Sequence, residues 1–158
     1  MTLVYRFKKE RLQNGAYVSR PRILVELSGS NGSIVIPALI DSGSDITIIP
    51  EGIAKAINLN MKGKKDKLYA YRESADVIQS TASITFLGKE YRQSVTLNNT
   101  TVLIALAKEG IKEEEDIVLG IEGIFDAFEI IFKKSENKIV FKTSSKSQTY
   151  KRLLHINY

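Results

Sequence analysis

The 158-residue chain contains 43% hydrophobic and 26% charged residues, a balance that is typical of one soluble globular domain. It has no cysteine, which excludes disulfides, thiolate catalysis and cysteine-zinc sites. It has a single histidine, His155, which argues against a Ser-His-Asp triad and against a multi-histidine metal site. We therefore expect neither a metal nor a cofactor.

The formal net charge is +5, and much of the excess lies in residues 62–67 and 133–152. Solubility is the favoured interpretation of these basic stretches. Nucleic acid is the less favoured partner, because the sequence lacks the clustered aromatic and basic residues typical of nucleic-acid binding. The sequence shows no signal peptide and no apolar run of membrane-spanning length, so we expect a cytoplasmic protein without a membrane partner.

Short runs of Val, Ile and Thr between turn residues predict many strands and little helix. In chain order the predicted strands are 23–27, 34–40, 46–49, 68–71, 77–86, 91–97, 101–107, 117–119, 128–132 and 138–141. The helical spacing of Ile53, Ala56 and Ile57 predicts a short helix at 51–59, and one helical turn is expected at 124–127. Turns are expected at 28–33 and 98–100. This pattern favours an all-β fold, a closed antiparallel β-barrel with one or two short helices.

The tripeptide Asp41-Ser42-Gly43 directly follows the apolar run 36–40. A carboxylate at the end of a buried strand is costly unless it is hydrogen-bonded or functional. Gly43 allows a sharp turn that brings backbone N–H groups close to the carboxylate, and the Ser42 hydroxyl can brace the site. The chain then returns to the interior at Thr47.

The segment 38–50, ALIDSGSDITIIP, resembles the active-site segment of the retropepsin-like aspartic proteases. The later segment 117–120, IVLG, resembles the second signature of that family, in which apolar residues and a glycine pack behind the catalytic loop. Residues 124–128 are similar to the helix that follows it. The resemblance extends over residues 22–142 and implies the retropepsin-like type of β-barrel.

The resemblance implies an aspartic endopeptidase that binds a peptide or protein substrate. In such an enzyme two carboxylates share one proton and activate a water molecule. Because this chain carries one such aspartate, the resemblance also implies a two-fold homodimer in which each subunit supplies Asp41. The implied supporting residues are Ser42, Gly43, Thr47, Leu119 and Gly120, and the implied substrate-binding residues are Asp45, Tyr71 and Arg72. We expect one protease domain at residues 1–142 and a basic tail at 143–158.

Two features depart from the family pattern. The hairpin in the position of the family's flap, residues 68–80, has no glycine at its tip, and Gly120 is followed by Ile121 and Glu122 where the family often has an arginine paired with the acid that Asp45 resembles. Asp45 would then need another cation, for which the candidates are Arg6, Arg11 and Arg22 of either subunit. These departures leave open a non-catalytic peptide-binding or dimerisation module on the same barrel.

Overall fold

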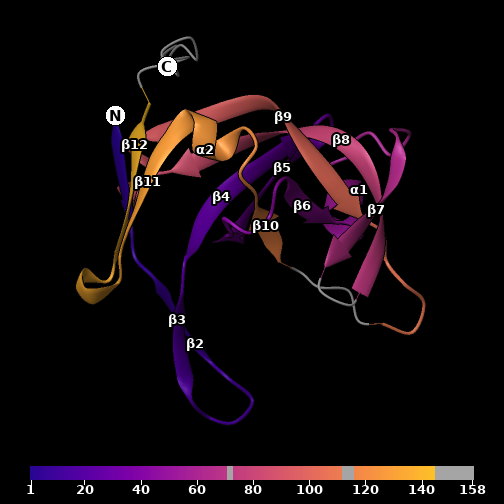
Figure 1. Cartoon of the computed structure of the whole chain (residues 1–158). Coiled ribbons are helices and arrows are strands. Elements are labelled where there is room, and N and C mark those ends of the chain that lie inside the picture. Colours follow the sequence, from indigo (N-terminus) through magenta and orange to yellow (C-terminus); the bar gives the residue numbers. More distant parts are fainter. Residues whose placement is uncertain (71–72, 112–115, 145–158) are drawn as a thin grey trace.

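The computed structural model describes residues 1–70, 73–111 and 116–144, and its secondary structure is mostly strands (Figure 1). Two short α-helices accompany them, α1 (Glu51–Ala56) and α2 (Ile124–Ala127). Two single turns of 3-10 helix, η1 (Lys89–Tyr91) and η2 (Lys134–Glu136), lie in loops. The expectation of an all-β fold with two short helices is therefore confirmed.

The main sheet has seven strands in the order β4-β5-β10-β6-β9-β8-β7. The strand bounds are β4 (Arg22–Gly29), β5 (Gly32–Ile40), β6 (Thr47–Pro50), β7 (Lys65–Ala70), β8 (Glu73–Leu87), β9 (Ser94–Ala105) and β10 (Ile117–Leu119). Most pairings in this sheet are antiparallel, as expected, but β10 pairs with β5 in parallel and β6 pairs with β9 in parallel. Closure of the sheet into a barrel stays a prediction. Strand β8 also pairs with β4, which links the first strand of the order to the next-to-last.

A second sheet has three strands in the order β1-β12-β11, with β1 (Thr2–Tyr5), β11 (Phe128–Lys133) and β12 (Lys138–Thr143). It packs on the main sheet through aromatic rings. The ring centroid of Phe128 lies 4.9 Å from that of Phe86 and 5.2 Å from that of Phe141. All three rings are buried, so they join β8 of the main sheet to both strands of the β11–β12 hairpin in one core.

The remaining two strands, β2 (Lys8–Arg11) and β3 (Tyr17–Arg20), form a separate two-stranded ribbon, which we call the arm. The arm extends away from the two sheets (Figure 1). No strand was predicted before residue 23, so β1 and the arm are additions to the predicted fold. An isolated two-stranded hairpin is only marginally stable in water, so contacts at its base must contribute to holding it.

Several predicted elements are confirmed, including the β4–β5 hairpin, β10, α2 and the β11–β12 hairpin. Helix α1 is shorter than predicted, since Asn58 has a positive φ of 54° and turns the chain away after Ala56. The predicted turn at 98–100 is instead a β-bulge within β9, at which the pairing shifts between Ala82 and Ile84 of β8. A bulge bends the strand without ending it, and both flanking segments therefore belong to one strand.

The expected basic tail begins at the end of β12, and residues 145–158 of it lie outside the described residues. The division into a domain at 1–142 and a tail stays a prediction. Across the described residues, no helix is long and apolar enough to cross a membrane.

Candidate active site

Asp41 lies at the end of β5, at the point where two neighbouring segments meet it. The backbone N–H of Ile40 donates to the carbonyl of Pro21 at 2.9 Å, and that of Asp41 donates to the carbonyl of Leu119 at 3.1 Å. Ile40 is paired with Leu119 in the parallel ladder of β5 and β10. The backbone of Asp41 is thus fixed by β10, while its side chain is half-buried.

The loop after Asp41 folds back onto its carboxylate. The backbone N–H of Gly43 donates to Asp41 Oδ1 at 2.8 Å, and that of Ser44 donates to the Asp41 carbonyl at 3.2 Å. A Cβ atom added at Gly43 would lie 3.1 Å from Asp41 Oδ1, so a side chain there would crowd the carboxylate. Ser42 is exposed, and its side chain makes no hydrogen bond among the described residues. Its bracing role stays a prediction.

The segment at Gly120 packs directly behind this loop. Thr47 is fully buried, and its Oγ1 accepts a hydrogen bond from the Gly120 N–H at 3.1 Å. A Cβ atom on Gly120 would lie only 2.4 Å from the carbonyl carbon of Ile46, which no real packing allows. Leu119 is also fully buried. Glycine is therefore required at this position, and the structure brings Thr47, Leu119 and Gly120 together behind Asp41.

Two further backbone hydrogen bonds join the same loops. The N–H of Ile121 donates to the carbonyl of Ser44, and the N–H of Glu122 donates to the carbonyl of Asp45, each at 2.8 Å. The Asp45 side chain is exposed and forms no ion pair within residues 1–70, 73–111 and 116–144. Its substrate-binding role stays a prediction.

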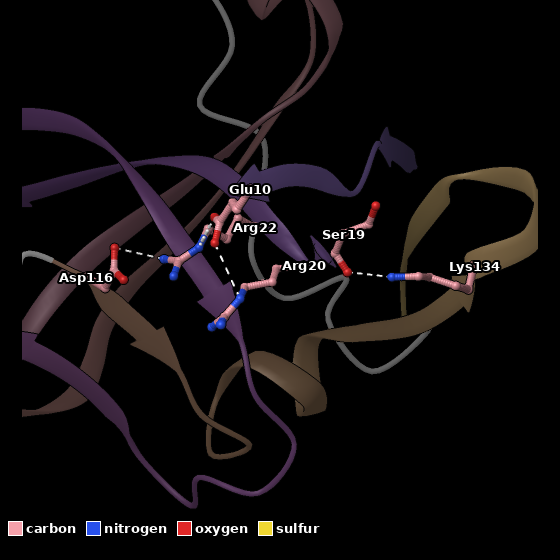
Figure 2. A network of polar contacts seen from close by, with 6 residues as sticks. All are labelled: Glu10, Ser19, Arg20, Arg22, Asp116 and Lys134. Atoms are coloured by element: carbon pink, nitrogen blue, oxygen red, sulfur yellow. Dashed lines mark hydrogen bonds and ion pairs between the residues drawn. The ribbon is translucent and has the colours of Figure 1, made fainter. Parts of the chain in front are cut away.

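Arg22, one of the three candidate partners of Asp45, makes different contacts in this chain. Its Nε lies 2.5 Å from Glu10 Oε1 on the arm, and its Nη1 lies 2.8 Å from Asp116 Oδ1, just before β10 (Figure 2). The Arg22 side chain is only 9% exposed, and these close ion pairs are not aligned as hydrogen bonds. Within its own chain Arg22 therefore pairs with Glu10 and Asp116, and the cation partner of Asp45 stays a prediction.

The same cluster attaches the arm to the body of the protein. Glu10 also pairs with Arg20 Nε at 3.4 Å, and Lys134 Nζ, from the loop between β11 and β12, donates to the carbonyl of Ser19 (Figure 2). Sequence reasoning missed this cluster, because its acids and bases lie far apart in the chain and no motif marks them. The signal available was the density of charged residues between residues 6 and 22.

The hairpin of β7 and β8 stands where the resemblance places the flap. Tyr71 and Arg72, the two predicted substrate contacts at its tip, lie outside the described residues, so their roles stay predictions. Among the residues that are described, no three His, Cys, Asp or Glu side chains are grouped closely enough to hold a metal ion.

A cavity of about 570 Å³ lies away from Asp41. It is lined by the β4–β5 turn, the segment after α1, residues 81–83 of β8 and Asn99 in the bulge of β9. The β4–β5 turn is at the opposite end of β5 from Asp41, so this cavity is not the place where Asp41 could meet a substrate.

The fold of the chain is similar to those of solved aspartic proteases. A retropepsin-like aspartic protease from Rickettsia conorii is similar over 89% of this chain and 92% of its own, with a TM-score of 0.53 at 14% sequence identity. The chain has a retropepsin-like fold. EIAV protease in complex with the inhibitor HBY-793 is also similar, over 64% of this chain and 81% of its own, with a TM-score of 0.40 at 16% identity. No family model matches the sequence, and no curated protein matches it either.

The retropepsin-like fold agrees with the resemblance seen in the segments around Asp41 and Gly120. At 14% identity the similarity defines the fold and leaves the chemistry to be argued from the residues themselves. The Asp41 carboxylate accepts a backbone N–H at one oxygen, from a loop that backbone hydrogen bonds hold in place. The sequence has no second aspartate that follows a strand and precedes Ser-Gly.

Proposed function

We propose that the chain is one half of a homodimeric aspartic endopeptidase, in which Asp41 of each subunit flanks the two-fold axis. The observation that carries the proposal is the position of Asp41: a half-buried carboxylate at the end of β5, held from behind by β10 and hydrogen-bonded to Gly43, in a retropepsin-like fold. A single carboxylate cannot serve as both general base and general acid in one step. Pairing two copies supplies the second.

In the proposed reaction the two Asp41 carboxyl groups share one proton, since like charges at close range cannot both ionise. The ionised carboxylate removes a proton from a water molecule, which attacks the peptide carbonyl carbon. The protonated partner donates its proton to the carbonyl oxygen, and collapse of the tetrahedral intermediate releases the two peptide products. The backbone N–H of Gly43 stabilises the ionised form by donating to Oδ1.

Replacing Asp41 with asparagine tests the proposal, because Asp41→Asn keeps the shape and removes the ionisable group. We expect cleavage of an unfolded protein substrate to fall by at least about 1,000-fold while the dimer persists. Asp126→Asn is the matched control. The Asp126 carboxylate accepts a hydrogen bond from the N–H of Gly123 at the start of α2, and this substitution should leave the cleavage rate close to that of the wild type. Wild-type cleavage by the Asp41→Asn chain would contradict the assignment.

Dependence on assembly gives a second test of the same proposal. Specific activity should fall on dilution in step with the dimer fraction measured by sedimentation velocity, because a monomer carries half of the dyad. After full exchange between equal amounts of wild type and Asp41→Asn, about one quarter of all dimers should be fully wild type. A monomer with constant specific activity would rule out the half-site arrangement.

A non-catalytic peptide-binding or dimerisation module is the second candidate. The glycine-free tip of the β7–β8 hairpin and the replacement of the family's arginine by Ile121 favour it. This alternative predicts that peptides bind without being cleaved, and that Asp41→Asn leaves their affinity unchanged.

A further inference from the structure

Three consecutive residues after β9 connect α1 to the β7–β8 hairpin. The N–H of Ala107 donates to Glu51 Oε2 at 2.8 Å, on the first turn of α1. On either side of Ala107 the contacts are with β8: the N–H of Leu106 donates to the carbonyl of Asp76 at 2.9 Å, and Lys108 Nζ donates to the carbonyl of Ser74. We call residues 106–108 the strap.

The attachment of the strap to α1 is well fixed. Glu51 carries an ion pair with Lys55 one turn along the helix, at 2.6 Å between Oε1 and Nζ, so its two oxygens have separate partners. The Glu51 side chain is only 18% exposed. A backbone N–H that donates to a partly buried, ionised carboxylate makes one of the stronger kinds of hydrogen bond.

The strap reaches β8 where the sheet no longer supports it. Strand β9 ends at Ala105, opposite Val77, so residues 73–76 of β8 extend beyond the ladder with β9. On their other side these residues pair with β7, whose far edge has no strand partner in the described sheet. The strap therefore holds the outer part of the hairpin on the side that faces away from β7.

The strap lies at the base of the hairpin, where β8, still paired with β7, leaves the ladder with β9. Residues 68–80 contain no glycine, so the sequence favours a swing of the paired strands as one unit about their junction with the main sheet. Such a swing would separate Lys108 from Ser74 and Leu106 from Asp76.

We propose that Glu51 is a positioning residue that, through the strap, limits how far the β7–β8 hairpin opens, an inference that rests on the proposed protease function, in which this hairpin covers Asp41 as the family's flap does. In this role Glu51 acts through the strap and not on the reacting atoms. It holds Ala107, and thereby keeps Leu106 and Lys108 against β8.

Hydrogen exchange of the full-length chain tests the strap without any need for activity. We expect Glu51→Ala to accelerate exchange in peptides covering residues 65–80 about tenfold, and Lys108→Met to accelerate it about threefold, because each removes a contact that closes the hairpin. Glu51→Gln keeps a neutral acceptor for the Ala107 N–H and should restore most of the protection. Lys64→Met, at an exposed lysine before β7, is the control and should exchange like the wild type.

Two exchange results would overturn the proposal. One is an unchanged rate in residues 65–80 of Glu51→Ala. The other is an equal acceleration in β4 and β5, which would mean that the substitution loosens the whole fold and not the hairpin.

Peptide cleavage then separates positioning from general stability. A hairpin that opens too far should raise KM about three- to tenfold for Glu51→Ala with little loss of kcat, and Glu51→Gln should lie close to the wild type. Equal KM values in Glu51→Ala and the wild type would overturn the role of the strap and leave the protease proposal standing. A wild-type dimer that cleaves no peptide would instead remove the protease proposal and, with it, the role of Glu51 in closing the site.

Discussion

The loop around Asp41 and the β7–β8 hairpin are held by different kinds of contact. The loop is fixed by backbone hydrogen bonds to β10 and to residues 120–122, together with the buried hydroxyl of Thr47. Beyond its own β7–β8 ladder, the outer part of the hairpin is attached to the fold by the strap, through the Leu106 N–H and the side chains of Glu51 and Lys108. One region is built into the core and the other is attached to it.

This difference separates the two tasks that a protease site must perform. Segments whose hydrogen bonds are buried open only when much of the fold opens, whereas surface-bonded hairpins open locally at a small free-energy cost. Asp41 can therefore keep its geometry while the hairpin moves. Substitutions near Asp41 should lower the free energy of unfolding, and substitutions in the strap should change local motion.

Gly120→Ala should have the largest destabilising effect on the loop around Asp41. Its added methyl would overlap the backbone of Ile46, so the loops behind Asp41 must separate, and we expect a loss of at least about 3 kcal/mol in the free energy of unfolding. Denaturant titration measures this loss. Gly32→Ala is the matched control: a Cβ there meets nothing within 4 Å, and only its φ of 105° opposes alanine. A loss for Gly120→Ala no larger than that for Gly32→Ala would contradict the close packing behind Asp41.

Thr47→Val should have the next largest effect. Valine matches threonine in shape but leaves the Gly120 N–H without its acceptor inside the core, at a cost of about 1–3 kcal/mol. Thr96→Val is a useful comparison, since the Thr96 hydroxyl is exposed and bonds only to Thr85, and it should change stability by less than about 0.5 kcal/mol. Equal effects at the two positions would contradict a special role for the Thr47 hydroxyl.

The sequence was most informative in the first region. The order of an apolar strand, Asp41, Gly43 and a return to the interior at Thr47 pointed to the candidate site, and the resemblance of residues 117–120 to the family's second signature implied what packs behind it. These features are local, because each depends on residues adjacent in the chain or on a glycine with a steric requirement. The β4–β5 hairpin and α2 were predictable for the same reason.

Long-range pairing was not predictable in the same way. The parallel ladders of β5 with β10 and of β6 with β9 join segments whose apolar patterns fit either direction. The bulge at residues 98–99 appeared as a turn, because asparagines favour both structures. The strands of the arm have four residues each, and all four residues of β2 are charged, so the arm lacks the alternating apolar pattern that reveals a strand.

Arg22→Met tests a third kind of attachment, intermediate between the other two. The Arg22 guanidinium is largely buried, but Glu10 and Asp116 are 23% and 45% exposed, so water screens much of their interaction. We expect a loss of about 1 kcal/mol in the free energy of unfolding and faster hydrogen exchange in the arm. Lys138→Met removes an exposed ion pair with Glu136 and should leave the arm unchanged. Unaltered exchange in residues 8–20 of Arg22→Met would show that other contacts hold the arm.

The smallest expected effect is the contribution of Glu51, which holds the strap, to the pH dependence of the free energy of unfolding. Its hydrogen bonds from Lys55 and from the Ala107 N–H hold the pKa of Glu51 below its usual value of 4.5, against the opposing effect of burial. Because the pKa is lower in the folded chain than in the unfolded one, ionised Glu51 stabilises the fold above pH 4.5, and this contribution disappears as the pH falls through the folded-state pKa. The free energy of unfolding of the wild type should therefore exceed that of Glu51→Gln by about 1 kcal/mol or less at pH 7, and the difference should shrink toward pH 3.

Glu136→Gln is a contrasting variant, since exposed Lys133 and Lys138 also lower the pKa of Glu136. Its contribution should vanish in 1 M salt (~3 Å Debye length), whereas the hydrogen bond of Glu51 to Ala107 should survive the same salt. A pH-independent difference between wild type and Glu51→Gln would mean that Glu51 holds the strap no better as a carboxylate than as an amide.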